Sequence, residues 1–154
     1  MVRRLKIYFI HSTSTKIDYQ TILYRPIISS PICLRHELML PLSKGYQERY
    51  VKELLEEADL IIAEVSDPNF TLKLELKWAL AVNKPIKYIS LNNIISPKLV
   101  KLVPTIEQIT TTRPLIKIVE DFISHYADMT VAQAKDTTIV LGTIDEIIPE
   151  NAQE

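Results

Sequence analysis

Short apolar runs alternate with stretches of helical periodicity along most of the chain. Near-continuous apolar runs are typical of strands buried on both faces, and they occur at Leu5–Ile10, Leu60–Val65 and Ile86–Leu91. A weaker alternation predicts another strand over Leu34–Leu40, and we expect a further strand over Thr105–Thr110. Each of these segments has the length of an ordinary strand in a globular domain.

Helical periodicity fills the intervals between the strands. The predicted helices cover Ile17–Tyr24, Tyr46–Ala58, Phe70–Val82, Ser96–Val103 and Pro114–Ala127. The first should end before Pro26, because a proline disfavours helical geometry in the residue that precedes it. Two helices show the face that we expect them to bury, through apolar residues at every fourth position: Tyr50, Leu54 and Ala58 in one, and Phe70, Leu74 and Trp78 in the other.

Strand and helix in alternation predict a doubly wound parallel sheet. A flavodoxin-like single α/β domain with the strand order 2-1-3-4-5 fits the length of the chain. We assign this domain to residues 1–128 and a C-terminal extension to residues 129–154. Thr137–Leu141 and Ile144–Ile148 flank a Gly-Thr pair in that extension, which predicts a β-hairpin.

The C-terminal extension is too apolar to remain in water. It carries six large aliphatic residues: Ile139, Val140, Leu141, Ile144, Ile147 and Ile148. Burying each contributes on the order of 1.5–3 kcal/mol. A doubly wound sheet already has both faces covered, so the extension should pack on a sheet edge of its own domain or on a second copy of the chain. We expect a homo-oligomer.

Composition excludes several classes of protein. The chain has 154 residues, 47% of them hydrophobic, with 18 basic against 19 acidic residues, so it lacks the basic excess of a nucleic-acid surface. No apolar run is long enough to span a bilayer, and a single cysteine excludes an internal disulfide and a cysteine-based metal site. We expect a cytoplasmic protein with no membrane or nucleic-acid partner.

The scarcity of glycine excludes the usual phosphate loops. Only Gly45 and Gly142 occur, so no glycine-rich Rossmann or P-loop motif exists. No two histidines have the spacing of metal ligands on one helix face. We therefore expect no bound metal and no cofactor.

Polar side chains follow the strands at the edge where parallel α/β sheets bind ligands. His11 and Ser12 come after the first strand, and His11 could protonate a leaving base or contact a phosphate, or be a partly exposed loop residue. Tyr8 could line a pocket or pack beneath a helix. Asp67 could bind a ribose hydroxyl, although an N-cap or Asx-turn is the simpler interpretation.

Three segments occur in an order that is typical of one enzyme superfamily. They are IYFI at residues 7–10, EADLIIAEVSDP at residues 57–68 and LELKWALAVNKPI at residues 74–86. In this order they resemble the nucleoside 2-deoxyribosyltransferase superfamily, including its deoxynucleoside-monophosphate N-glycosidase branch. The resemblance spans roughly residues 5–91.

The resemblance implies a chemistry and the residues that perform it. Glu75 takes the place of the superfamily's nucleophilic glutamate, and Asp59 that of the aspartate before the third strand. Ala79 and the Lys84-Pro85 pair also match. Glu75 would attack C1′ of a deoxynucleoside or its monophosphate, and His11 or a water would assist departure of the base. Oligomeric assembly is a further implication, because related enzymes complete their pockets from a neighbouring subunit.

The chain also departs from the superfamily at several positions. Thr71, Lys73 and Lys77 replace glycines around the glutamate, and Asn69 replaces the serine that holds a 5′-phosphate. Bulk at glycine positions can close a pocket. A second interpretation is therefore a catalytically inactive nucleotide-binding or protein-interaction module, in which Glu75 is an ordinary solvated glutamate beside Lys73 and Lys77.

Overall fold

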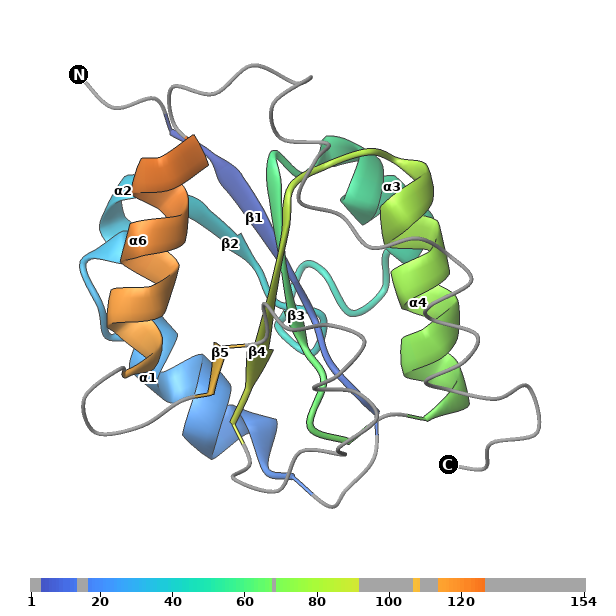
Figure 1. The fold of residues 1–154 in the computed structure, drawn as a ribbon, viewed down its shortest axis with the longest axis horizontal. Coiled ribbons are helices and arrows are strands. Elements are labelled where there is room, and N and C mark those ends of the chain that lie inside the picture. Colours follow the sequence, from blue (N-terminus) through green and yellow to red (C-terminus); the bar gives the residue numbers. More distant parts are fainter. Residues whose placement is uncertain (1–3, 14–16, 68, 92–106, 109–113, 127–154) are drawn as a thin grey trace.

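A parallel sheet organises the chain. The computed structural model describes residues 4–13, 17–67, 69–91, 107–108 and 114–126. Its strands are β1 (Lys6–Ile10), β2 (Glu37–Met39), β3 (Leu60–Glu64), β4 (Ile86–Ser90) and β5 (Glu107–Gln108). They pair in the order β2-β1-β3-β4-β5, every pair parallel (Figure 1). The flavodoxin-like α/β fold and the order 2-1-3-4-5 are confirmed.

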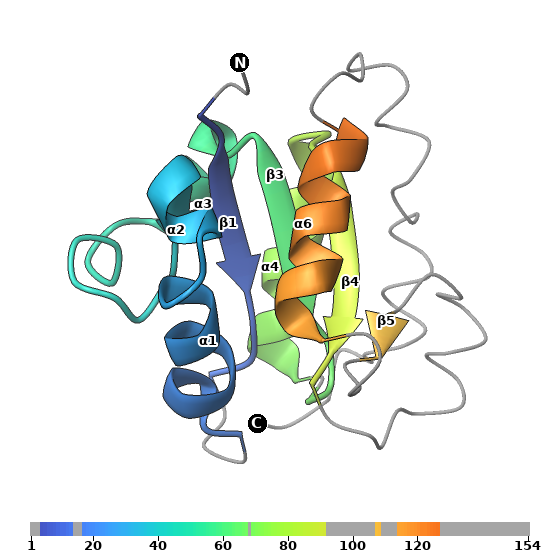
Figure 2. The same cartoon turned by 90° about the vertical axis from the view of Figure 1, so that its left-hand side faces the viewer.

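Helices cover both faces of the sheet (Figures 1 and 2). One face carries the π-helical turn η1 (Gln20–Tyr24), α1 (Arg25–Ile28), α2 (Ile32–Arg35) and α6 (Leu115–Tyr126); the other carries α3 (Val51–Glu57) and α4 (Phe70–Ala81). Successive residues of a strand point to opposite faces. Ile7 and Phe9 of β1 accordingly join the α6 side of the core, whereas Tyr8 and Ile10 join the α4 side.

The predicted end of the first helix before Pro26 is wrong. Helical backbone continues from η1 directly into α1, and Pro26 lies in the first turn of α1. In η1 each N–H bonds to the carbonyl five residues before it, instead of four as in an α-helix; an example is the bond from the Arg25 N–H to the carbonyl of Gln20. The proline therefore sits where the bonding pattern changes, and its missing N–H is tolerated at a helix start.

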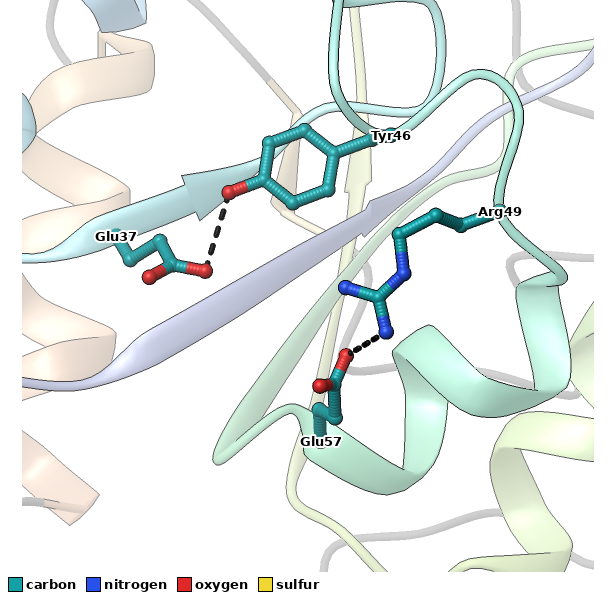
Figure 3. Close-up of polar contacts among 4 residues, drawn as sticks. All are labelled: Glu37, Tyr46, Arg49 and Glu57. Atoms are coloured by element: carbon teal, nitrogen blue, oxygen red, sulfur yellow. Dashed lines mark hydrogen bonds and ion pairs between the residues drawn. The ribbon is translucent and has the colours of Figure 1, made fainter.

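The segment from Leu34 to Ala58 also differs from its prediction. Residues Ile32–Arg35 are helical and strand β2 begins only at Glu37, while α3 begins at Val51 rather than at Tyr46. Side-chain contacts hold the intervening loop (Figure 3). The Tyr46 hydroxyl donates to Glu37 at 3.0 Å, and Arg49 pairs with Glu57 at 2.6 Å. The predicted face holds for Leu54 and Ala58, but Tyr50 is 80% exposed.

Helix α4 buries a different face from the predicted one. Its buried residues are Leu72, Lys73, Glu75, Leu76 and Ala79. Phe70 is instead 45% exposed, and Leu74 and Trp78 are only partly buried. Lys52 lies 4.8 Å from the centre of the Trp78 ring, so this ring packs against α3. The interpretation of Glu75 as a solvated helix glutamate is therefore wrong.

Asp59 and Lys84 make hydrogen bonds at the edge of the sheet where the strands begin. Asp59 accepts the Lys6 N–H at 2.9 Å, and the Asp59 N–H donates to the Lys6 carbonyl at 2.7 Å. Lys84 donates to the carbonyls of Glu56 and Ala58 at 3.1 and 2.7 Å, which caps the C-terminal end of α3. Asp59 and Lys84 thus stabilise the fold at the amino ends of the strands, away from the ligand-binding edge.

Some expectations fall outside the described residues. The predicted helix Ser96–Val103 and the hairpin of residues 129–154 lie there, and so do the boundary of the extension and most of Thr105–Thr110. Within that last segment Glu107–Gln108 pairs with β4, as predicted. Among the helices that the structure describes, none is both long and apolar enough to cross a membrane.

Candidate functional site at the carboxyl ends of β1 and β3

The chain leaves β1 and β3 toward opposite faces of the sheet. After β1 it leads to η1 and α1 on one face, and after β3 it leads to α4 on the other. These two strands are neighbours, with Ile10 paired to Ala63. In sheets of this kind ligands bind where the connections diverge. The loops that begin at His11 and Ser66 border this point.

Glu75 points from α4 into the protein. It is 7% exposed, and no hydrogen bond or ion pair from the described residues reaches its carboxylate. Burial raises its pKa to about 7, because a desolvated charge is disfavoured. The side chain is therefore close to half ionised at neutral pH, which suits a group that acts as a nucleophile or exchanges a proton.

Tyr8 of β1 lies within electrostatic range of Glu75. Its side chain is fully buried, and its hydroxyl has no hydrogen-bond partner among the residues that the structure describes. Burial raises the pKa of Tyr8 most, and the nearby charge of Glu75 raises it further. An unpaired buried hydroxyl is costly. It is accordingly a ready donor for the Glu75 anion or for a bound ligand.

His11 is buried and already bonded on both ring nitrogens. Nδ1 lies 2.8 Å from the Ser12 carbonyl, and Nε2 lies 2.7 Å from the Tyr24 hydroxyl. A carbonyl only accepts, so Nδ1 carries the proton and Nε2 accepts from Tyr24. Burial lowers the pKa of His11. The ring is therefore neutral in this arrangement and offers no free proton to a leaving base.

Ser12, Asp67 and Asn69 come together between the two loops. The Asn69 amide donates to the Ser12 hydroxyl at 2.8 Å, and that hydroxyl donates to Asp67 at 3.3 Å. Asn69 also accepts the Leu72 N–H at 2.9 Å. The N-cap of α4 is therefore Asn69, and the interpretation of Asp67 as the cap is wrong. Of these three side chains only Asp67 is partly exposed.

Glu64 is a site residue that the sequence analysis missed. It is 1% exposed at the end of β3 and accepts hydrogen bonds from Tyr19, from the Ser66 backbone and hydroxyl, and from the Leu91 N–H. One signal was available. Glu64 is a single acidic residue in the otherwise apolar run LIIAEV, and a carboxylate is rarely buried without a specific role.

Tyr19 and Tyr24 also join the site without having been predicted. The ring of Tyr19 stacks on His11, with centroids 4.1 Å apart and planes at 22°. Burial raises the pKa of Tyr24 to about 12, and the charge of Glu75 contributes to that rise. Tyr24 therefore contacts His11 and lies within electrostatic range of Glu75. No group of three potential metal ligands occurs among the described residues.

Comparison with known proteins adds no relative. No protein-family model matches the chain, and no curated protein matches it.

Proposed function

We propose that the protein is a nucleoside 2-deoxyribosyltransferase-like enzyme that cleaves or transfers the N-glycosidic bond of a deoxynucleoside or its monophosphate. The observation that carries the proposal is the buried Glu75 carboxyl, which has a pKa of about 7 and lies within electrostatic range of the unpaired Tyr8 hydroxyl. The resemblance of residues 57–68 and 74–86 to that superfamily supports it.

The chemistry proceeds by two displacements at C1′. An oxygen of ionised Glu75 forms a bond to C1′ as the C1′–N bond breaks, and the electron pair of that bond leaves with the base. The departing nitrogen takes a proton. His11 is neutral with both nitrogens bonded, which favours a water molecule as the donor. Water or a second base then attacks C1′ and releases Glu75.

The remaining polar residues are assigned to substrate binding. Asp67, the partly exposed member of the Ser12–Asp67–Asn69 group, is suited to accept a ribose hydroxyl. Tyr8 is suited to hold the carboxylate of Glu75 in its ionised form. In this proposal the ligand is a nucleoside or nucleotide, the assembly is a homo-oligomer, and the single cysteine agrees with a cytoplasmic location.

The proposal is tested by base release. Purified protein is incubated with each deoxynucleoside and its monophosphate, and free base is followed by chromatography. Release should be abolished in Glu75→Gln and retained in Glu53→Gln, a matched change at an exposed glutamate of α3. The rate should rise with pH around pH 7, because ionised Glu75 is the nucleophile. Equal release by wild type and Glu75→Gln would refute the role of Glu75.

A second candidate is a catalytically inactive ligand-binding or interaction module. The close burial of Glu75 and Lys73 favours it, since Lys73 is only 3% exposed at a position where the superfamily carries glycine. Calorimetry with the same nucleosides and nucleotides separates the two. Binding without base release supports a nucleotide-binding module, whereas absence of both supports a protein-interaction module.

A further inference from the structure

Glu64 is a buried carboxylate that the proposed reaction does not use. Its Oε1 accepts from the Ser66 N–H at 3.1 Å and from the Tyr19 hydroxyl at 3.2 Å. Its Oε2 accepts from the Leu91 N–H at 2.7 Å and from the Ser66 hydroxyl. No lysine or arginine of the described chain pairs with it. The four donors therefore replace both water and a counter-ion.

The pattern of donors requires two accepting oxygens. A backbone N–H points at each oxygen, from Ser66 at one and from Leu91 at the other. A backbone N–H only donates. A glutamine in this position would place its own NH₂ against one of these donors in either orientation. The site is thus built for a carboxylate, and an amide of equal size does not satisfy it.

Glu64 is connected to the site through aromatic rings. The Tyr19 hydroxyl that donates to Glu64 belongs to the ring that stacks on His11. Nε2 of His11 accepts from the Tyr24 hydroxyl, which also accepts the Leu42 N–H at 3.0 Å. Tyr24 in turn lies close enough to Glu75 for the carboxylate charge to raise its pKa. A continuous series of contacts thus runs from Glu64 through Tyr19 and His11 to Tyr24.

We propose that Glu64 is a positioning residue of the site at the carboxyl ends of β1 and β3. Its carboxylate fixes the Tyr19 ring against His11, which keeps Nδ1 of His11 on the Ser12 carbonyl and Nε2 on the Tyr24 hydroxyl. The catalytic consequence rests on the proposed function, because it concerns the rate at which Glu75 reacts. The structural consequence, the state of His11, is measurable in the resting protein.

The test uses two variants with matched controls. Glu64→Gln places a donor against a backbone N–H. Tyr19→Phe keeps the stacked ring but removes the bonds of its hydroxyl to Glu64 and to the Ser12 backbone. Tyr46→Phe and Glu37→Gln make the same chemical changes in a tyrosine–glutamate pair that joins the edge strand β2 to the loop after it (Figure 3). Nitrogen-15 NMR of the histidine side chains then reports which His11 nitrogen carries the proton.

We expect wild type and both controls to show protonated Nδ1 and unprotonated Nε2. Both site variants should show a mixture of the two tautomers, with the pKa of His11 raised toward 6.5 as water reaches the ring. With an active enzyme, kcat should fall roughly tenfold or more while KM changes little, because small displacements of catalytic groups are costly.

An unchanged His11 nitrogen pattern in both variants overturns the proposal. If Glu64→Gln fails to fold, an unchanged nitrogen pattern in Tyr19→Phe still overturns the proposal, since the phenylalanine keeps the volume of the ring. A mixture of His11 tautomers in Tyr46→Phe or Glu37→Gln also overturns the proposal, because the change would then not depend on the contact between Glu64 and Tyr19. A wild type without turnover refutes the proposed function, while the NMR result still decides the role of Glu64.

Discussion

Two buried carboxylates at the same edge of the sheet have opposite surroundings. Glu64 accepts hydrogen bonds from four donors, whereas no donor among the described residues reaches Glu75. Burial raises the pKa of both. A carboxylate that is fully bonded is held in place by its partners, and one that lacks partners keeps its oxygens for a ligand. This contrast agrees with the positioning role that we propose for Glu64 and the reacting role that we propose for Glu75.

Glu75 should make the stability of the protein depend on pH. Its pKa is about 7 in the folded chain against 4.5 as the ordinary value. Between these pH values the native state retains a proton that the unfolded chain has released, so stability falls as pH rises. Glutamine does not titrate, so Glu75→Gln does not lose stability in this way. The free energy of unfolding of the variant should therefore rise by about 3 kcal/mol relative to that of wild type between pH 4.5 and pH 8.

Urea unfolding at several pH values measures this difference. The comparison with Glu75→Gln cancels the contributions of the other titrating groups, including His11 and Glu64. Exposed Glu53→Gln serves as the control, and its difference from wild type should stay constant across the range. If the difference in free energy of unfolding between Glu75→Gln and wild type were also constant with pH, the pKa of Glu75 would not be raised in the folded chain.

At the scale of elements, Asn69 fixes the start of α4 through two hydrogen bonds, one within the helix and one to another loop. Asn69 accepts the Leu72 N–H and donates to Ser12, so it caps the helix and ties it to the loop after β1. Asn69→Ala removes both bonds in a buried position and should cost about 1–3 kcal/mol. Asn69→Ser, which can still cap, should lose less. Thermal unfolding measures both, and equal losses would mean that the cap contributes nothing.

Helix α3 is held at its other end by a lysine from the α4–β4 connection. Lys84 donates to the last carbonyls of α3, at Glu56 and Ala58. Lys84→Met keeps most of the aliphatic stem and removes the charge, so it should destabilise the protein by about 1–2 kcal/mol. The exposed Lys44→Met should have an effect within about 0.5 kcal/mol. Equal effects of the two in urea unfolding would contradict the capping role.

At the scale of the whole molecule, both faces of the sheet are covered by helices of the same chain (Figure 2). We expect the aliphatic residues of the extension, residues 129–154, to be buried at an edge of the sheet or against a partner. We expect light scattering to find an oligomer for the full chain and a monomer for a version that ends at Asp128. A monomeric full chain would reject the oligomer, and an unchanged oligomer after truncation would exclude the extension from its interface.

The sequence by itself determined the strands β1, β3 and β4, the order of the strands in the sheet and the edge at which the polar residues lie. Strands buried on both faces consist of near-continuous apolar runs, so LKIYFI, LIIAEV and IKYIS could be recognised without tertiary information. Helix α6 was also well predicted, because its apolar residues lie on one side. Parallel topology then placed His11, Ser12 and Asp67 at one edge.

Only the tertiary structure decided which side of α4 is buried and which polar groups meet. Apolar residues occur nearly all round α4, so its periodicity does not select a face, and packing against β1 and α3 buries Glu75 while leaving Phe70 half exposed. The contacts of Glu64 with Tyr19 and Leu91 join residues far apart in the sequence. Local sequence patterns carry no information on such pairs, because these residues meet only when the elements that carry them pack together and bury their side chains.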